Sequence, residues 1–333
     1  STLYFCSYVT SIVSQSSLHV RQKYIFFVLK KVDPKLVFAV SGNASIDEYY
    51  LVDSIPRADE AQEAKDYFQR VGGAASNVAV AMAKLGVKVF FIGAVGGDKQ
   101  GDFILDNFSR EGVDTKWIVR SSKPTGRVII LLDSNGDRAM VALRGANTDL
   151  TPGFLNLEEA LRGVEHVHLS STKPEYTSWV FEIAKSKGVT TSYDPGMTIA
   201  SKGFSYVRET LRMVDILFVN KREYETLGPE YLDSQFNGLL VLKEGSLGSR
   251  LPKLGIGVPA FKVHAVDTTG AGDAFNAAFL VAWKLGFSLE QCLLVANAAG
   301  ALKATRVGAH SSPTLSELNE FLVKNGYEPL TLV

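Results

Sequence analysis

The residues best suited to chemistry lie in the segment 267–275, which reads DTTGAGDAF. Two glycines flank an alanine just before a long apolar run of helical character, and Asp273 falls in the first turn of that run. The first amides of a helix lack partners within the helix, and the positive end of the helix dipole attracts anions. The segment therefore predicts a phosphate-binding turn with a carboxylate beside it.

A transferring phosphoryl group needs hydrogen-bond donors for its oxygens and a group that accepts the proton of the attacking hydroxyl. Because the segment offers both, it predicts a kinase in which Asp273 is the base. The predicted catalytic set is Asp273 together with the main-chain amides of Gly270, Ala271 and Gly272. Glycine-rich turns also precede many helices without function, and an aspartate in a first turn often only compensates the dipole, so the segment alone leaves this alternative open.

Two signatures suggest a family. The sequence DTTGAGDAFNAAF resembles the C-terminal signature of the ribokinase-like, or PfkB, carbohydrate kinases, and residues 72–86, GGAASNVAVAMAKLG, are similar to their N-terminal signature. The signatures occur in the family's order, and the resemblance extends from about Leu36 to the C-terminus. It implies transfer of the γ-phosphoryl group of ATP to a primary hydroxyl of a small sugar, with Mg²⁺ as cofactor.

The bulk composition agrees with a small-molecule enzyme. The chain has 333 residues, 46% of them hydrophobic, and its 35 basic residues balance its 35 acidic ones. A zero formal charge gives no electrostatic reason to expect nucleic acid or an acidic membrane as partner, and no apolar run approaches the roughly 20 residues of a membrane helix. Cys6 and Cys292 lie far apart without metal-type spacing and support no disulfide framework. We expect a cytoplasmic protein.

Short β-rich runs alternate with helical patterns along the chain, which predicts crossover units around a parallel sheet. The predicted strands span residues 36–40, 88–92, 166–169, 190–193, 216–219 and 239–242. The predicted helices span residues 74–85, 101–110, 175–187, 204–213, 271–285 and 289–305. The resemblance implies that these elements form a ribokinase-like three-layer α/β/α fold, with a mostly parallel central sheet and a small β lid.

Two stretches break this alternation, residues 48–71 and 127–144. The first is polar with alternating character, and the second contains Asn135-Gly136, a strong hairpin signal. In the resembling family such segments form a lid that closes over the sugar and often pairs with a second subunit. We therefore expect a lid and, by the same resemblance, a homodimer through it.

The kinase domain is predicted to cover residues 36–312, with 313–333 as the C-terminal helix and tail of the same domain. Residues 1–30 are predicted to be an N-terminal extension outside this fold, because the family-like part begins near Leu36 and no charged leader precedes a hydrophobic stretch of the secretory kind. A wrongly assigned start, with the true one near Val28, is the alternative interpretation.

The residues expected to bind the sugar come from two early segments. A carboxylate can accept hydrogen bonds from vicinal hydroxyls, and paired glycines let a ligand approach the backbone closely. By their match to the family's motifs, the expected sugar contacts are Asp47, Gly72, Gly73 and Asn77. A turn-forming aspartate and a helix start capped near Asn77 are the structural alternatives. Ribokinases carry GGKGAN where this chain has Ala74 and Ala75, a departure that argues against ribose as the acceptor.

The residues expected to bind ATP lie in the second half of the chain. Asn220 and Glu223 resemble the family's NxxE motif, whose acid organises Mg²⁺ through water, and Mg²⁺ does keep much of its hydration shell in proteins. The same two residues also fit a helix cap, and both interpretations can hold together. The resemblance assigns to the nucleotide site, in addition, Lys243, Gly245, Asn297 and Gly308.

A monovalent cation is expected beside the phosphate-binding turn. Asp267, Thr269 and the loop 305–312 resemble the cation site of potassium-activated members of the family. A cation there would orient the turn electrostatically without contacting the substrate. The resemblance thus implies K⁺ as an activator.

Three other functions remain open. Residues 72–86, 170–175 and 194–196 also look like those of broad-specificity nucleoside kinases, which phosphorylate a ribosyl 5'-hydroxyl. A catalytically silent ligand-binding protein on the same fold is a second alternative, although it would have no chemical need of both Asp273 and the turn. A dinucleotide oxidoreductase is disfavoured because residues 93–98, GAVGGD, lack the fingerprint spacing. His166 and His168 have no ligand spacing and are interpreted as strand residues.

Overall fold

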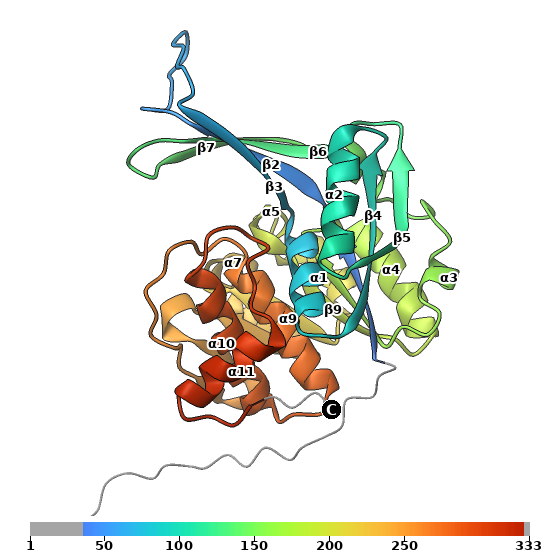
Figure 1. The fold of residues 1–333 in the computed structure, drawn as a ribbon. Helices are drawn as coiled ribbons and strands as arrows, with labels where there is room; N and C mark the ends of the chain where they lie inside the picture. The colour runs from blue at the N-terminus through green and yellow to red at the C-terminus, as the bar shows by residue number, and fades with distance from the viewer. Residues whose placement is uncertain (1–35, 330–333) are drawn as a thin grey trace, which may run out of the picture.

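The computed structural model describes residues 36–329, so the predicted extension over residues 1–30 lies outside the described residues. At its centre is a nine-stranded sheet in the order β13-β12-β11-β10-β9-β8-β1-β4-β5 (Figure 1). Neighbours from β11 to β5 run parallel, and β12 and β13 add antiparallel pairs at one edge. The strands are β1 (Val37–Gly42), β4 (Lys88–Gly96), β5 (Asp114–Ser121), β8 (His166–Ser170), β9 (Thr190–Asp194), β10 (Ile216–Asn220), β11 (Leu239–Lys243), β12 (Ser249–Leu251) and β13 (Ile256–Val258).

Helices cover both faces of this sheet. One face carries α1 (Ala74–Lys84), α2 (Lys99–Arg110), α9 (Ala271–Lys284), α10 (Leu289–Ala304) and α11 (Leu315–Lys324). The other face carries α3 (Leu157–Ala160), α4 (Pro174–Ser186), α5 (Gly196–Ala200), α6 (Phe204–Leu211), α7 (Lys221–Leu227) and α8 (Pro229–Gln235). The predicted three-layer α/β/α fold is confirmed.

The alternation of side chains along each strand divides the interior into two hydrophobic cores. In β1, Phe38 and Val40 join the core under α1 and α9, whereas Ala39 joins the core on the opposite face. In β10, Phe218 and Leu217 divide in the same way. Because successive strand residues point to opposite faces, a strand buried on both sides is apolar over most of its length.

A separate four-stranded sheet projects from this body (Figure 1), in the order β3-β2-β6-β7. Its strands are β2 (Ser45–Leu51), β3 (Asp66–Gly72), β6 (Gly126–Leu132) and β7 (Arg138–Leu143). The hairpin between β6 and β7 turns at the predicted Asn-Gly pair: Gly136 has a φ of 87°, and the carboxylate of Asp133 accepts the amides of Asn135 and Asp137 at 2.9 Å. The small β sheet expected beside the central one is therefore present.

The sequence patterns missed several short or exposed elements. The edge strand β5 is partly exposed and polar, and β12 and β13 have three residues each, so none of them carries the continuous apolar run of an internal strand.

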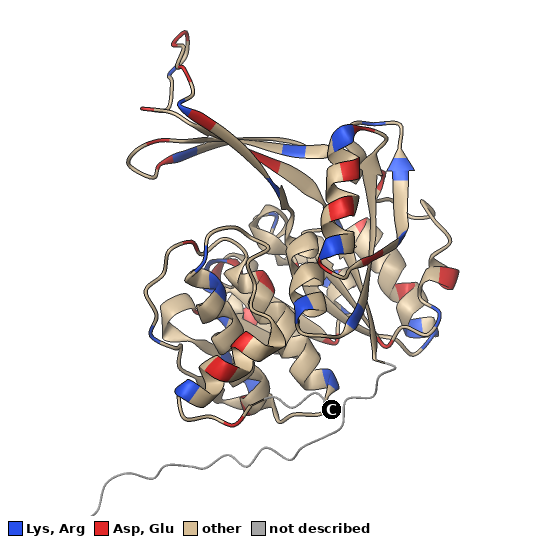
Figure 2. Cartoon of the chain, in the orientation of Figure 1, with Lys and Arg blue, Asp and Glu red and all other residues tan. Residues whose placement is uncertain are grey.

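Charged residues do not gather on one side of the molecule. Figure 2 shows basic and acidic residues interspersed over the small sheet and the body, in agreement with the zero formal charge. Among residues 36–329, no helix combines the length and hydropathy needed to cross a bilayer.

Candidate active site

The turn before α9 is built around Gly270. This residue caps the helix with a φ of 79°, in the left-handed region, and a Cβ built on it would lie 2.9 Å from the carbonyl oxygen of Ala309. The amide of Ala271 donates to the carbonyl of Thr268 at 3.1 Å, so that amide is already engaged within the turn. The amides of Gly272 and Asp273 have no acceptor among the described residues, as expected for the first turn of a helix.

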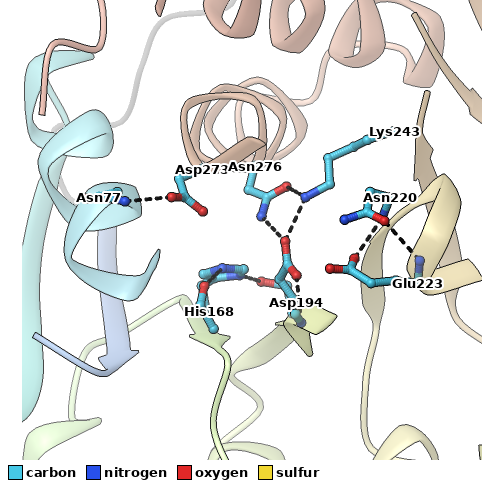
Figure 3. Close-up of polar contacts among 11 residues, drawn as sticks. Asn77, His168, Asp194, Asn220, Glu223, Lys243, Asp273 and Asn276 are labelled. Carbon is cyan, nitrogen blue, oxygen red and sulfur yellow. Dashed lines mark hydrogen bonds and ion pairs between the residues drawn. The ribbon is translucent and has the colours of Figure 1, made fainter. Parts of the chain in front are cut away.

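The carboxylate of Asp273 faces the helix that carries the N-terminal signature. Asn77 Nδ2 donates to Asp273 Oδ2 at 2.8 Å, from the buried first turns of α1 (Figure 3). Burial raises the pKa of Asp273 to about 6, and the charges of Asp194 and Glu223 act in the same direction. The hydrogen bond from Asn77 opposes this shift. A carboxylate with this pKa is largely ionised at neutral pH and is a stronger base than an ordinary aspartate.

A buried polar cluster lies next to Asp273. Lys243 Nζ donates to Asp194 Oδ2 at 2.7 Å and to Asn276 Oδ1 at 3.1 Å, while Asn276 Nδ2 donates to Asp194 Oδ2 at 2.7 Å (Figure 3). Asp194 is the last residue of β9, and Lys243 is the last residue of β11. Because the carboxyl ends of parallel strands lie at the same edge of a sheet, the two side chains can meet there. The cluster therefore fixes the Lys243 ammonium, paired with the Asp194 carboxylate, beside the α9 turn.

The charges of this cluster shift one another. Burial alone would lower the pKa of Lys243, but Asp194 and Glu223 raise it above its ordinary value. For Asp194, burial acts upward and Lys243 outweighs it, so the pKa of this carboxyl is lowered. A Cβ built on Gly272 would lie 3.4 Å from Lys243 Nζ, which sets this ammonium beside the free amides of the turn. Ammonium and amides together form an anion-binding surface.

The pair Asn220 and Glu223 forms the helix cap that the sequence allowed. Asn220 Oδ1 accepts the amide of Glu223 at 2.9 Å, and Glu223 Oε2 accepts the amide of Asn220 at 2.8 Å, at the start of α7. Glu223 is buried, and its pKa is raised by burial and by the charge of Asp194. A buried carboxylate kept near a second one favours a nearby cation.

On the small sheet, Asp47 is held against the paired glycines. Ser45 Oγ donates to Asp47 Oδ1 at 3.3 Å, and burial raises the pKa of Asp47 to about 6. A Cβ built on Gly72 would lie 2.3 Å from Asp47 Oδ2, and one built on Gly73 would lie 2.3 Å from the carbonyl oxygen of Asn43. Gly72 is therefore required by the close approach of the Asp47 carboxylate, and Gly73 by the close approach of the Asn43 carbonyl between β1 and β2.

A large cavity opens beside the α9 turn. Its volume is about 470 Å³, and its lining includes Lys243, Gly245, Ala271, Gly272 and Asn297. The side chain of Asn297 supports the wall, since its Nδ2 donates to the carbonyl oxygens of Val258 and Pro259 at 3.0 and 3.3 Å. The volume suits a nucleotide-sized ligand.

Gly308 does not line this cavity. Its amide donates to Asp267 Oδ2 at 2.8 Å, and Asp267 Oδ1 accepts the amide of Thr269 at 2.9 Å. Burial acts to raise the pKa of Asp267, but these two main-chain donors outweigh it and lower that pKa. The Asp267 carboxylate thus connects the loop that contains Gly308 to the turn before α9.

Sequence reasoning gave no role to three residues of this region, Asp194, Asn276 and Lys303. Asn276 follows Asp273 by three positions, which puts both on one helix face. Lys303 lies in the last turn of α10 and is buried, although lysine is almost never fully buried unless it is paired. His166 and His168 are buried in β8 and bond the hydroxyls of Thr190, Ser192 and Ser170, as expected for strand residues.

Comparison with known proteins identifies relatives over most of the chain. Residues 37–315 match the model of the pfkB family of carbohydrate kinases. The chain is 36% identical to an ATP-dependent ribose-1-phosphate kinase from Halopiger xanaduensis, over 85% of this chain and 96% of that protein. It is 34% identical to ribokinase from Bacillus subtilis, over 85% and 98% of the two chains.

Solved structures show the same fold. The crystal structure of ribokinase from Thermotoga maritima superposes with a TM-score of 0.77 at 29% identity, covering 86% of this chain and 99% of that one. A nucleoside kinase from Methanocaldococcus jannaschii superposes with a TM-score of 0.75 at 25% identity, covering 86% and 98%.

Proposed function

The chain belongs to the pfkB family of carbohydrate kinases and is an ATP-dependent sugar kinase, and from this premise we propose that Asp273 is the base that activates a primary hydroxyl of a ribose-type acceptor. The observation that carries the proposal is the bond between Asn77 and Asp273 beside the free amides of the α9 turn. It joins the two signature segments around one carboxylate whose pKa is raised by burial.

In the proposed reaction the acceptor oxygen attacks the γ-phosphorus of ATP. The bond between that phosphorus and the β–γ bridging oxygen breaks, ADP leaves, and the hydroxyl proton passes to Asp273. The amides of Gly272 and Asp273 and the Lys243 ammonium stabilise negative charge on the phosphate oxygens. Asn77 orients the carboxylate and lowers its pKa, which keeps the base ionised.

The proposed nucleotide site is the cavity beside the turn, and the residues present also fit Mg²⁺. No group of three or more His, Cys, Asp or Glu side chains that could hold a metal ion occurs within residues 36–329. Mg²⁺ needs no such group, because it is commonly held by one or two carboxylates, water and substrate phosphates. Glu223 is the carboxylate proposed to face it through water. When bound, Mg²⁺ neutralises charge on the nucleotide phosphates.

The acceptor is proposed to bind between Asp47 and Asp273. Asp47, packed against Gly72, would accept hydrogen bonds from sugar hydroxyls. The small sheet that carries Asp47 is proposed to act as a lid that excludes water. A nucleoside presents the same hydroxymethyl group as a free sugar, so the nucleoside kinase alternative makes use of the same residues.

One observation favours a phosphorylated acceptor as a second candidate. A small cavity of about 100 Å³ is lined by Asn43, Thr148, Arg144, Lys173 and the acidic Glu175, and Arg144 Nη2 donates to Asn43 Oδ1 at 3.5 Å. Lys173 also caps α4, so the positive end of that helix lies at the cavity. Two cationic side chains and a helix N-terminus suit a phosphate group, and the relative from Halopiger xanaduensis acts on ribose 1-phosphate.

We also propose a homodimer through the small sheet. Tyr67, Ile129, Val141 and Leu143 are 41 to 69% exposed and share one face of that sheet by register, while Asp47 lies on the other face. Adjacent exposed apolar side chains on a sheet are typical of a protein contact.

A coupled ADP-release assay tests the proposed function. The acceptors are ribose, ribose 1-phosphate, fructose, adenosine and inosine, each with ATP and Mg²⁺. Release with one acceptor class supports kinase activity and names that class. Absence of release with every acceptor, in a protein that still binds ADP, would contradict the proposal and favour the silent ligand-binding alternative.

A further inference from the structure

A lysine side chain lies where a monovalent cation was expected. Lys303 projects from the last turn of α10, is 0% exposed, and donates from Nζ to the carbonyl oxygens of Asp267 and Arg306 at 3.0 and 3.1 Å. These carbonyls belong to the phosphate-binding turn and to the loop 305–312, the two segments that the resemblance assigned to K⁺. The lysine joins the same two segments that a bound cation would join.

Several oxygens around this point already accept hydrogen bonds from donors of the chain, whereas Ser312 Oγ, in the loop 305–312, is buried without a partner among the described residues. Main-chain carbonyls are the ligands with which proteins replace the hydration shell of K⁺, and an ammonium group supplies three donors and no acceptor. Both Asp267 carboxylate oxygens accept main-chain amides, and the Ala304 carbonyl accepts the amides of Val266 and Asp267 at 2.7 and 3.1 Å. The Lys303 ammonium therefore occupies the Asp267 and Arg306 carbonyls that a potassium ion between these two segments would use.

The charge of Lys303 has a partner. Burial lowers the pKa of this lysine, and the carboxylate of Asp267 opposes that shift. The ammonium is hydrogen-bonded to two carbonyls and lies in the field of a carboxylate that favours its charged form, and hydrogen bonding is a condition under which a buried charge is tolerated.

Lys303 donates a hydrogen bond to Asp267, and the chain continues from Asp267 directly into the turn before α9. Gly308 donates to Asp267, and Gly270 packs against Ala309, so the turn and the loop form one unit ahead of α9. We propose that the Lys303 ammonium takes the place of the activating monovalent cation, so that nucleotide binding and turnover in this protein are independent of K⁺. This inference rests on the proposed kinase function and concerns its regulation.

Replacing K⁺ by tetramethylammonium in the buffer of the unaltered protein tests the inference first. Isothermal titration with ADP is carried out in KCl and in tetramethylammonium chloride at equal ionic strength, and the thermal midpoint is measured in both salts. The expected result is an ADP dissociation constant that agrees within about twofold and an unchanged midpoint, because a ligand that binds only the folded state would raise that midpoint. Binding that is about tenfold tighter in KCl, or a midpoint raised by KCl, would overturn it.

These measurements need no acceptor, so their outcome is separate from that of the proposed function. A protein that fails to phosphorylate any sugar can still bind ADP equally in both salts. If ADP binds in neither salt, the kinase proposal fails, and the thermal midpoint in the two salts still decides whether K⁺ binds.

A charge-removing variant tests the lysine itself. Lys303→Met keeps most of the side-chain volume, and Lys324→Met on exposed α11 is the matched control. In tetramethylammonium chloride, Lys303→Met is expected to weaken ADP binding by about tenfold, while the control binds like the parent protein. Unchanged ADP affinity in a folded Lys303→Met protein would contradict the inference. If this variant does not fold, the comparison of KCl with tetramethylammonium chloride on the unaltered protein decides whether the inference holds.

Discussion

Asn77 Nδ2 lies 2.8 Å from Asp273 Oδ2, although the two residues are 196 positions apart. The first belongs to α1 and the second to α9, two helices packed side by side on one face of the sheet. Packing of these helices converts two distant sequence signatures into one oriented carboxylate beside free amides. The proposed chemistry depends on this contact.

Removal of the Asp273 carboxylate should stop catalysis without removing nucleotide binding. Asp273→Ala is expected to lower turnover by about a hundredfold or more, because no other group would accept the hydroxyl proton. ADP affinity by isothermal titration should stay within a few-fold, since the amides and Lys243 remain. Asp106→Asn, an exposed aspartate on α2, is the control. Near-normal turnover in Asp273→Ala would rule out this residue as the base.

Turnover should depend on pH through the ionisation of Asp273. Only the ionised carboxylate accepts a proton, and burial raises its pKa to about 6, so kcat at saturating acceptor should fall about tenfold per pH unit below pH 6. Asn77 lowers that pKa, so Asn77→Ala should move the acid limb to higher pH. Asp47 also has a pKa of about 6, and Asp47→Asn separates its contribution. An acid limb that stays in place in Asn77→Ala would argue that Asn77 does not tune the base.

Loss of Lys243 should destabilise the folded protein as well as the nucleotide site. Lys243→Met leaves the buried Asp194 carboxylate without its ion pair, a change that typically costs about 3–5 kcal/mol in the free energy of unfolding. Lys185→Met breaks the half-exposed pair with Asp215 and should cost less than about 1 kcal/mol. Urea denaturation measures both. The double variant Asp194→Asn, Lys243→Met should be more stable than Lys243→Met, because it has no unpaired carboxylate. Equal stability of the two variants would contradict loss of the ion pair as the cause of the destabilisation.

A methyl group at Gly72 should weaken acceptor binding and leave nucleotide binding unchanged. The Cβ of Gly72→Ala would lie 2.3 Å from Asp47 Oδ2 and must displace that carboxylate. The KM for the acceptor is expected to rise about tenfold or more, while ADP affinity is unchanged. Gly257→Ala, whose Cβ would meet its nearest atom at 3.5 Å, is the control. An unchanged acceptor KM would remove Asp47 from the proposed sugar site.

A charge on the outer face of the small sheet should break the proposed homodimer. Val141 is 69% exposed, and Val141→Asp would bury an unpaired carboxylate in an interface while leaving the folded monomer nearly unaffected. Light scattering after size-exclusion chromatography is expected to show a dimer for the parent protein and a monomer for the variant. Ser134→Asp, on the exposed β6–β7 turn, is the control. A monomeric parent protein at micromolar concentration would contradict the proposal.

Local patterns in the sequence were sufficient for the family, the α/β class and most internal elements. Buried parallel strands appear as short apolar runs, and Asn135-Gly136 marks its hairpin by turn chemistry alone, because these signals depend on neighbours in the chain. The turn at Gly270 and the candidate base Asp273 could be recognised for the same reason.

Contacts between segments that are distant in the sequence could be identified only in the folded structure. The cluster of Asp194, Lys243 and Asn276 joins two strand ends and a helix, and the raised pKa of Asp273 arises from burial and from charges on other elements. The sequence resemblance predicted a cation at Asp267, Thr269 and the loop 305–312, whereas packing of α10 brings Lys303 Nζ to the carbonyl oxygen of Asp267. Burial and electrostatics depend on which surfaces meet in three dimensions, and no local pattern encodes that.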